Sequence, residues 1–97
     1  MKIVLNCENL RRREQAHRYL AQMLDFPAYY GRNLDALFDC LTEIGDCTIV
    51  LDGEEELLQD GGYGKRILEV IREAAQANPG LKLGKPEIED LPEEVVD

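Results

Sequence analysis

The stretch TIVLDG, residues 48–53, is an apolar and β-branched run that stops at an Asp-Gly turn signal. A second run of this kind, Ile3 to Leu5, ends at Asn6 near the start of the chain. Short runs that are apolar on both faces are typical of buried strands in a parallel sheet. We therefore predict two buried strands, at residues 3–5 and 48–51.

The segment after the first strand predicts a helix at residues 12–24. Its apolar side chains recur at helical spacing, and Asp25-Phe26-Pro27 ends the pattern. Arg11-Arg12-Arg13 offers no side chain that can cap this helix, and positive charge there opposes the helix dipole. The one histidine, His17, lies on or near the apolar side, so we expect it to be a packing residue.

A connector at residues 27–32 leads to a second predicted helix. Within it we expect Gly31 to take a positive φ, which other residues resist. Asn33 is a good N-cap, and Asp35 is favourably placed in the first turn of a helix at residues 34–43.

The second half of the chain predicts three further elements. Residues 54–59 suggest a short helical turn, and residues 60–64 are rich in glycine and suggest a loop. An amphipathic helix at residues 65–77 ends at Asn78-Pro79-Gly80, and residues 81–83 suggest a short third strand. This order predicts an α/β fold, a small three-stranded parallel sheet with crossover helices packed against it.

The chain of 97 residues fits one domain, which we place at residues 1–84. Residues 85–97 form an acidic C-terminal stretch that we expect to be a frayed tail. The alternative is that this tail covers part of the sheet, using the apolar side chains Ile88, Leu91, Val95 and Val96.

The acidic residues are concentrated in one part of the chain. The formal net charge is −9, and residues 33–64 hold nine acids and no base. Binding to nucleic acid or to an anionic membrane surface needs the opposite charge, so we expect neither as a partner. Solubility alone explains an acidic chain but does not require the acids to be segregated. A surface for a cationic partner is the other interpretation.

The predicted helix at residues 34–43 has two different faces when its side chains are placed at about 100° per residue. The apolar face holds Leu34, Leu37, Phe38 and Leu41, and the opposite face holds Asp35, Asp39, Thr42 and Glu43. Like charges four residues apart destabilise a helix by about 0.2–0.5 kcal/mol per pair, so these acids suggest a use for the charge. A solvated polar face is the alternative.

Two neighbouring features favour a protein-binding surface. Tyr29-Tyr30-Gly31 lies just before the acidic helix at residues 34–43. Glu73, in the predicted helix at residues 65–77, would extend the acidic face if these two helices are neighbours. Carboxylates bordered by aromatic side chains suit a protein partner with complementary charge.

Nothing in the sequence predicts catalysis. The chain has no serine, and an exposed acidic helix face offers no concave site in which the pKa of a carboxyl group would rise. Cys7, Cys40 and Cys47 form no C-x-x-C pair, so we expect reduced thiols, and with a single histidine we expect no metal site and no cofactor. The absence of a leader or membrane-spanning run in this sequence suggests the cytoplasm.

The sequence resembles the barstar family, which are intracellular protein inhibitors of barnase-type guanyl-specific ribonucleases. The resemblance is carried by PAYYGRNLDALFDCLT at residues 27–42 and, more briefly, by Arg72-Glu73-Ala74. It runs without gaps from Lys2 to Leu51. This resemblance implies a three-stranded parallel sheet with helices, and inhibition by covering the enzyme's active site.

The resemblance also implies roles for single residues. Asp39 would occupy the place of a substrate phosphate among the basic residues of the ribonuclease, and Tyr29 would pack against its catalytic region. Asp35 and Glu73 would pair with cationic or polar groups of the enzyme. The residues that would fill in around them are Gly31, Asn33, Leu34, Phe38 and Thr42.

Two functions follow as hypotheses. The first is inhibition of a basic, extracellular-type ribonuclease in a 1:1 heterodimer, with the free protein monomeric. The alternative is a barstar-like binding or immunity module for a different basic toxin or regulatory protein. The family has tryptophans at the positions of Phe38 and Ile44, a departure that bears on the choice of partner.

Overall fold

Three parallel strands form a sheet in the order β1-β2-β3 in the computed structural model, which describes residues 1–84. The strands are β1 (Lys2–Asn6), β2 (Cys47–Asp52) and β3 (Leu81–Gly84). The register pairs Ile3 with Ile49, and Ile49 in turn with Leu83. The predicted three-stranded parallel α/β fold is therefore confirmed. The predicted tail at residues 85–97 lies outside the described residues.

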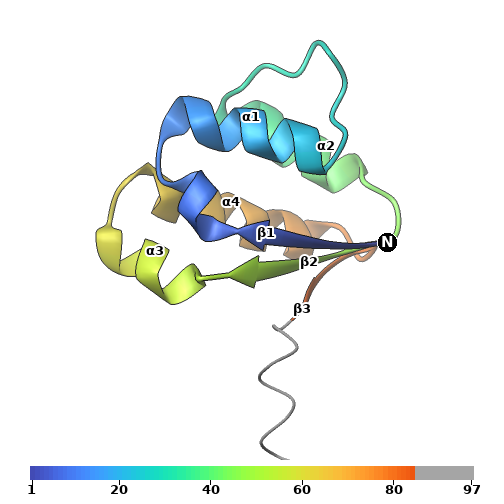
Figure 1. The fold of residues 1–97 in the computed structure, drawn as a ribbon. Coiled ribbons are helices and arrows are strands. Elements are labelled where there is room, and N and C mark those ends of the chain that lie inside the picture. The colour runs from blue at the N-terminus through green and yellow to red at the C-terminus, as the bar shows by residue number, and fades with distance from the viewer. Residues whose placement is uncertain (85–97) are drawn as a thin grey trace, which may run out of the picture.

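The connections between the strands are helical, as parallel strands require. They are the 3-10 helix η1 (Cys7–Leu10) and the α-helices α1 (Arg13–Met23), α2 (Leu34–Glu43), α3 (Glu54–Asp60) and α4 (Tyr63–Ala77). Figure 1 shows α1, α2 and α4 on one side of the sheet, with the connection between α1 and α2 rising away from it at the top of the view. α3 follows the carboxyl end of β2.

One core lies between the sheet and these helices. The apolar faces predicted for α2 and α4 point into it, and Leu37, Leu41, Ile67 and Ile71 are fully buried. The sheet contributes alternate residues, because successive side chains of a strand point to opposite faces. The strand residues in this core are Leu5, Cys47, Ile49, Leu51 and Leu81.

The prediction that both faces of the first strand are buried is wrong. Val4 is 50% exposed, whereas its neighbour Leu5 is fully buried. β1 is an edge strand, and the helices seen in Figure 1 cover only one face of the sheet. A run of apolar residues therefore does not reveal which face lacks a helix.

The predicted loop at residues 60–64 is also largely wrong, because α3 extends to Asp60 and α4 begins at Tyr63. Gly64 is buried inside the first turn of α4, where a Cβ atom would lie 2.9 Å from the carbonyl oxygen of Leu10. This glycine serves close packing between helices rather than a turn. The 3-10 helix at Cys7–Leu10 had no counterpart in the sequence prediction.

Candidate protein-binding site

Helix α2 begins as the sequence predicts and exposes its acidic face. The Asn33 side chain caps it, since Oδ1 accepts a hydrogen bond from the backbone N–H of Ala36 at 2.7 Å. Asp35, Asp39 and Glu43 are exposed on the side opposite the core. The predicted division of this helix into an apolar and an acidic face is confirmed.

The loop before α2 presents one tyrosine to solvent and buries the next. Tyr29 is 88% exposed, whereas Tyr30 is 8% exposed and its ring packs on Phe26 with a centroid separation of 4.8 Å. The backbone N–H of Tyr30 donates to the carbonyl of Pro27 at 3.0 Å. The loop is thus anchored by Tyr30 and displays Tyr29.

The expectation of a positive φ at Gly31 is wrong. The left-handed conformation falls instead on Arg32, with a φ of 56°. Gly31 has a different reason to lack a side chain, because a Cβ atom there would lie 3.3 Å from the Cβ atom of Ala36 on α2. The glycine allows the loop to approach the start of the helix closely.

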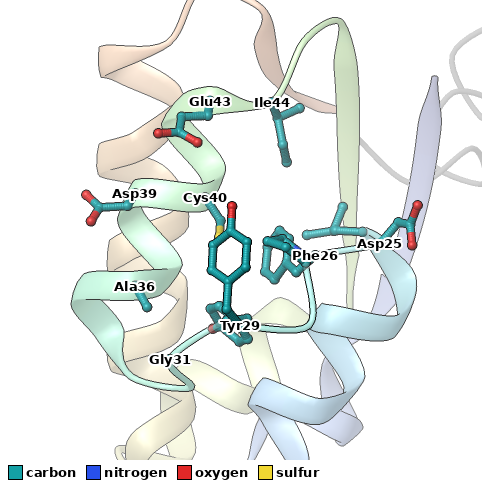
Figure 2. A pocket seen from close by; sticks show the side chains of 12 residues that line it. Asp25, Phe26, Tyr29, Gly31, Ala36, Asp39, Cys40, Glu43 and Ile44 are labelled. Carbon is teal, nitrogen blue, oxygen red and sulfur yellow. The ribbon is translucent and has the colours of Figure 1, made fainter.

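A cavity of about 540 Å³ lies between this loop and α2 (Figure 2). It is lined by Leu24, Asp25, Phe26, Pro27, Tyr29, Tyr30, Gly31, Ala36, Asp39, Cys40, Glu43 and Ile44. Three of the residues predicted for the site, Tyr29, Gly31 and Asp39, are therefore brought together in it. Apolar side chains form part of its wall, and Asp25, Asp39 and Glu43 lie at its rim; in Figure 2 the carboxylates of Asp25 and Asp39 point away from the enclosed space.

Sequence reasoning did not assign several residues that line this cavity. Glu43 was placed on the acidic face but not in the site, although its position four residues after Asp39 was a usable signal. Asp25 and Ile44 flank helix ends and carried no such signal. Cys40 also lines the cavity, and burial raises the pKa of its thiol, so it is present as the neutral thiol.

A second cavity of about 370 Å³ holds three other predicted residues, Asn33, Leu34 and Asp35. Arg13, Tyr63 and Arg66 complete its lining. Asp35 therefore lines the same hollow as two arginines from other helices, which the sequence could not show. The predicted site is divided between two adjacent hollows, one with Asp39 and one with Asp35.

The remaining residues predicted for the site lie on α2 and α4. Phe38 is half-buried on α2, and the hydroxyl of Thr42 donates to the carbonyl of Asp39 at 2.9 Å. Glu73 is exposed on α4, which packs directly against α2. Its neighbour Arg72 forms an ion pair with Glu54 at the start of α3.

The predicted packing role of His17 is confirmed, and its ring also makes two polar contacts. His17 is 1% exposed, with Nδ1 at 2.6 Å from the hydroxyl oxygen of Tyr30 and Nε2 at 2.7 Å from that of Tyr63. The ring therefore joins α1 to the Tyr29 loop and to α4.

Within residues 1–84 no three potential protein ligands gather in a way that could hold a metal ion. None of the helices in this part of the chain has the length and apolar character needed to cross a bilayer. The candidate site combines exposed carboxylates, one exposed tyrosine and two hollows.

Comparisons with known proteins agree with the fold and extend the resemblance found at residues 27–42. The family described as "Barstar (barnase inhibitor)" matches residues 1–85, which include every strand and helix described above. A protein of Bacillus subtilis (strain 168) named "Putative ribonuclease inhibitor YrdF" is 41% identical over 78 residues, covering 77% of this chain and 86% of that protein. The chain therefore belongs to the barstar family.

Proposed function

We propose that this protein is an inhibitor, not an enzyme, and that it blocks a barnase-type guanyl-specific ribonuclease in a 1:1 complex. The observation that carries the proposal is the exposed Tyr29 beside a hollow bordered by Asp39. An aromatic side chain that is 88% exposed beside carboxylates supports a partner anchor, since tyrosines are enriched in interface cores.

The basic active site of a ribonuclease suits this surface chemically. Such a site holds cationic groups that bind the phosphates of RNA, and the carboxylate of Asp39 would replace a phosphate among them. Tyr29 would pack against the catalytic region, and Asp35 and Glu73 would pair with further cationic groups. The residues around these four are Gly31, Asn33, Leu34, Phe38 and Thr42, with Glu43 added by the geometry of the cavity.

The experiment is a titration of a barnase-type ribonuclease with the full-length protein. We expect stoichiometric loss of activity, and we expect Asp39→Ala to weaken inhibition by about a hundredfold or more. Glu55→Ala is the matched control, because it removes one exposed carboxylate from α3, and it should change inhibition by less than about threefold. Unchanged ribonuclease activity would reject the function, and equal inhibition by Asp39→Ala would reject the site.

The proposal places the protein in the cytoplasm, where it would guard the cell against a basic ribonuclease of the extracellular type. The free protein would be a monomer, with its acidic face open to the enzyme. Sedimentation of the free protein and of its mixture with the ribonuclease would test both stoichiometries.

A second candidate is a binding or immunity module for a different basic toxin or regulatory protein. One observation favours it: Arg13 and Arg66 line the same hollow as Asp35, so that half of the surface is not purely acidic. Capture of a basic protein without ribonuclease activity, lost in Asp39→Ala but kept in Glu55→Ala, would support this candidate over the first.

A further inference from the structure

His17 occupies a junction between three parts of the molecule. It belongs to α1, its Nδ1 contacts Tyr30 in the loop that displays Tyr29, and its Nε2 contacts Tyr63 at the start of α4. Both contacts are short, at 2.6 and 2.7 Å, and the ring is 1% exposed. The loop therefore has a polar anchor in addition to the packing of Tyr30 on Phe26.

The two tyrosines determine which nitrogen of the ring carries the proton. The hydroxyl of Tyr30 is buried, and among residues 1–84 its hydrogen-bond partner is His17. A buried hydroxyl that donates to no acceptor is costly, so Tyr30 donates to Nδ1. A neutral ring must then hold its proton on Nε2 and donate it to the hydroxyl oxygen of Tyr63, whose side chain is only half-buried.

The charges around the ring oppose its protonation. A cavity of about 360 Å³ at the ring is lined by Arg13, Glu14 and Arg18 of α1 and by Arg32 of the loop. Three cations against one carboxylate make the surroundings positive. Burial first, and then Arg13, lower the pKa of His17 below its ordinary value of 6.5.

The other elements next to the ring add one charge of each sign. From α4, Tyr63 contacts the ring, and Arg66 lines a hollow together with Tyr63 and Arg13. From α2, Asp35 lines that same hollow. With Arg66 and Asp35 added, four arginines stand against two carboxylates, so the surroundings of the ring stay positive.

We propose that neutral His17 is a positioning residue for ribonuclease binding, because it accepts the hydroxyl of Tyr30 and so fixes the loop that displays Tyr29. The role rests on the proposed function. A protonated ring has no lone pair for that hydroxyl, so the Tyr30 oxygen could only accept from Nδ1–H, and its own buried proton would lack an acceptor. Acid would therefore weaken the Tyr30 anchor and, with it, the hold on the loop. The pKa of His17 is lower in the folded chain than in the unfolded chain. The neutral ring therefore contributes its full share of the folding free energy above about pH 6.5, and this contribution is lost as the pH falls through the pKa of the folded state.

The first measurement needs no ribonuclease and follows the nitrogens of His17 by NMR during a pH titration. We expect the Nε2–H tautomer in the wild-type protein. Tyr30→Phe removes the donor to Nδ1 and should raise the pKa of the ring. Tyr19→Phe is the matched control, because its hydroxyl, on the same helix, accepts instead from the backbone N–H of Asn6 at 2.9 Å. An Nδ1–H tautomer, or no change in the pKa of the ring in Tyr30→Phe, would overturn the proposed contact.

The second measurement follows dissociation from a barnase-type ribonuclease between about pH 8 and pH 5. At the upper pH, Tyr30→Phe should dissociate about five- to tenfold faster than wild type, the effect of one lost hydrogen bond. The ratio should fall towards one in acid, where the Tyr30 hydroxyl of the wild-type protein can no longer donate to Nδ1. Because each ratio compares two variants with one enzyme, ionisation of the ribonuclease itself cancels.

The outcomes separate this role from a merely structural one. A ratio that is constant across pH, or an equal effect in Tyr19→Phe, would overturn the positioning role while leaving inhibition intact. If the wild-type protein did not bind the ribonuclease at any pH, the proposed function would fail and the positioning role with it. The NMR titration would still decide whether the Tyr30 hydroxyl depends on neutral His17.

Discussion

At the scale of single residues, Tyr29 and Tyr30 are adjacent but have opposite surroundings. Tyr29 is 88% exposed and Tyr30 is 8% exposed. A side chain that touches little of its own chain contributes little to folding. Under the proposed function, the exposed ring of Tyr29 would serve binding, whereas the buried ring of Tyr30 holds the shape of the loop.

This contrast predicts that Tyr29→Ala separates binding from stability. We expect the free energy of unfolding to change by less than about 0.5 kcal/mol, while inhibition of a barnase-type ribonuclease weakens at least about tenfold. Urea unfolding and inhibition titrations measure the two effects. Tyr30→Ala is the comparison, and it should lower stability by about 3 kcal/mol or more. A loss of stability in Tyr29→Ala as large as in Tyr30→Ala would contradict the assignment.

Gly64 gives a second prediction at this scale, on stability alone. A Cβ atom there would lie 2.7 Å from the Cγ atom of Leu57 and 2.9 Å from the carbonyl oxygen of Leu10. Gly64→Ala should therefore destabilise the protein by about 1–3 kcal/mol, although alanine favours helices. Gly45→Ala is the control, because a Cβ atom would meet nothing within 4 Å, and its change in stability should stay within about 1 kcal/mol. Equal midpoints of urea unfolding for the two variants would rule out the tight packing described at Gly64.

At the scale of elements, the C-terminal end of α2 depends on one side chain from the end of α4. The amide nitrogen of Asn78 donates to the carbonyls of Leu41 and Ile44, each at 2.9 Å, and its oxygen accepts from the N–H of Gly80 at 3.0 Å. The last carbonyls of a helix otherwise lack partners. Asn78 thus links α2, α4 and the start of β3.

We expect Asn78→Ala to lower the free energy of unfolding by about 1–3 kcal/mol, because partly buried carbonyls lose their donor. Asn9→Ala is the matched control, since Oδ1 of Asn9 accepts one exposed hydrogen bond from the side-chain amide of Gln15 at 3.2 Å. It should change stability by less than about 0.5 kcal/mol. Thermal or urea unfolding of both variants measures the difference, and a loss in Asn9→Ala that matches Asn78→Ala would refute the link.

The elements also show why the sequence predicts some features and not others. The 3.6-residue period of α2 and its Asn33 cap are local properties, and both were predictable. The exposure of Val4 depends on which face of the sheet the helices cover, which no local pattern contains. The first turn of α4 includes Gly64, which packs closely against Leu57 of α3 and against the backbone of Leu10, far away in the sequence. Distant contacts, rather than propensity, decided these cases.

In the candidate site too, local patterns were predictable from the sequence and contacts between separate segments were not. The acidic face of α2 could be predicted from the sequence, because side chains three and four residues apart lie on the same face of a helix. The hollow beside Asp39 is also lined by Leu24, Asp25 and Phe26, which come from the end of α1 and the loop after it and reach α2 only in the folded chain. The arginines next to Asp35 are a further example, since Arg13 and Arg66 come from α1 and α4.

At the scale of the whole molecule, the net charge of −9 is distributed unevenly. All nine charged residues between 33 and 64 are acids, whereas α1 and the loop place Arg13, Arg18 and Arg32 around His17. The molecule therefore has an acidic face on α2 and a basic region around His17. Under the two proposals above, the acidic face would attract a cationic partner, and the basic region would keep His17 neutral and so hold the loop that displays Tyr29.

This distribution predicts that ionic strength acts on association rather than on dissociation. Raising salt from about 0.05 M to about 0.5 M shortens the Debye length from roughly 14 Å to roughly 4 Å, so attraction between the acidic face and a basic ribonuclease is screened before contact. The association rate constant should fall at least about tenfold, and the dissociation rate constant should change by less than about threefold, because close pairs are screened less. Stopped-flow mixing measures both rates. Asp39→Asn and Glu55→Gln remove the same charge from different places, so faster dissociation only in Asp39→Asn is expected. An association rate constant that does not change with salt concentration would contradict the role of the acidic face and would favour burial of apolar groups as the cause of association.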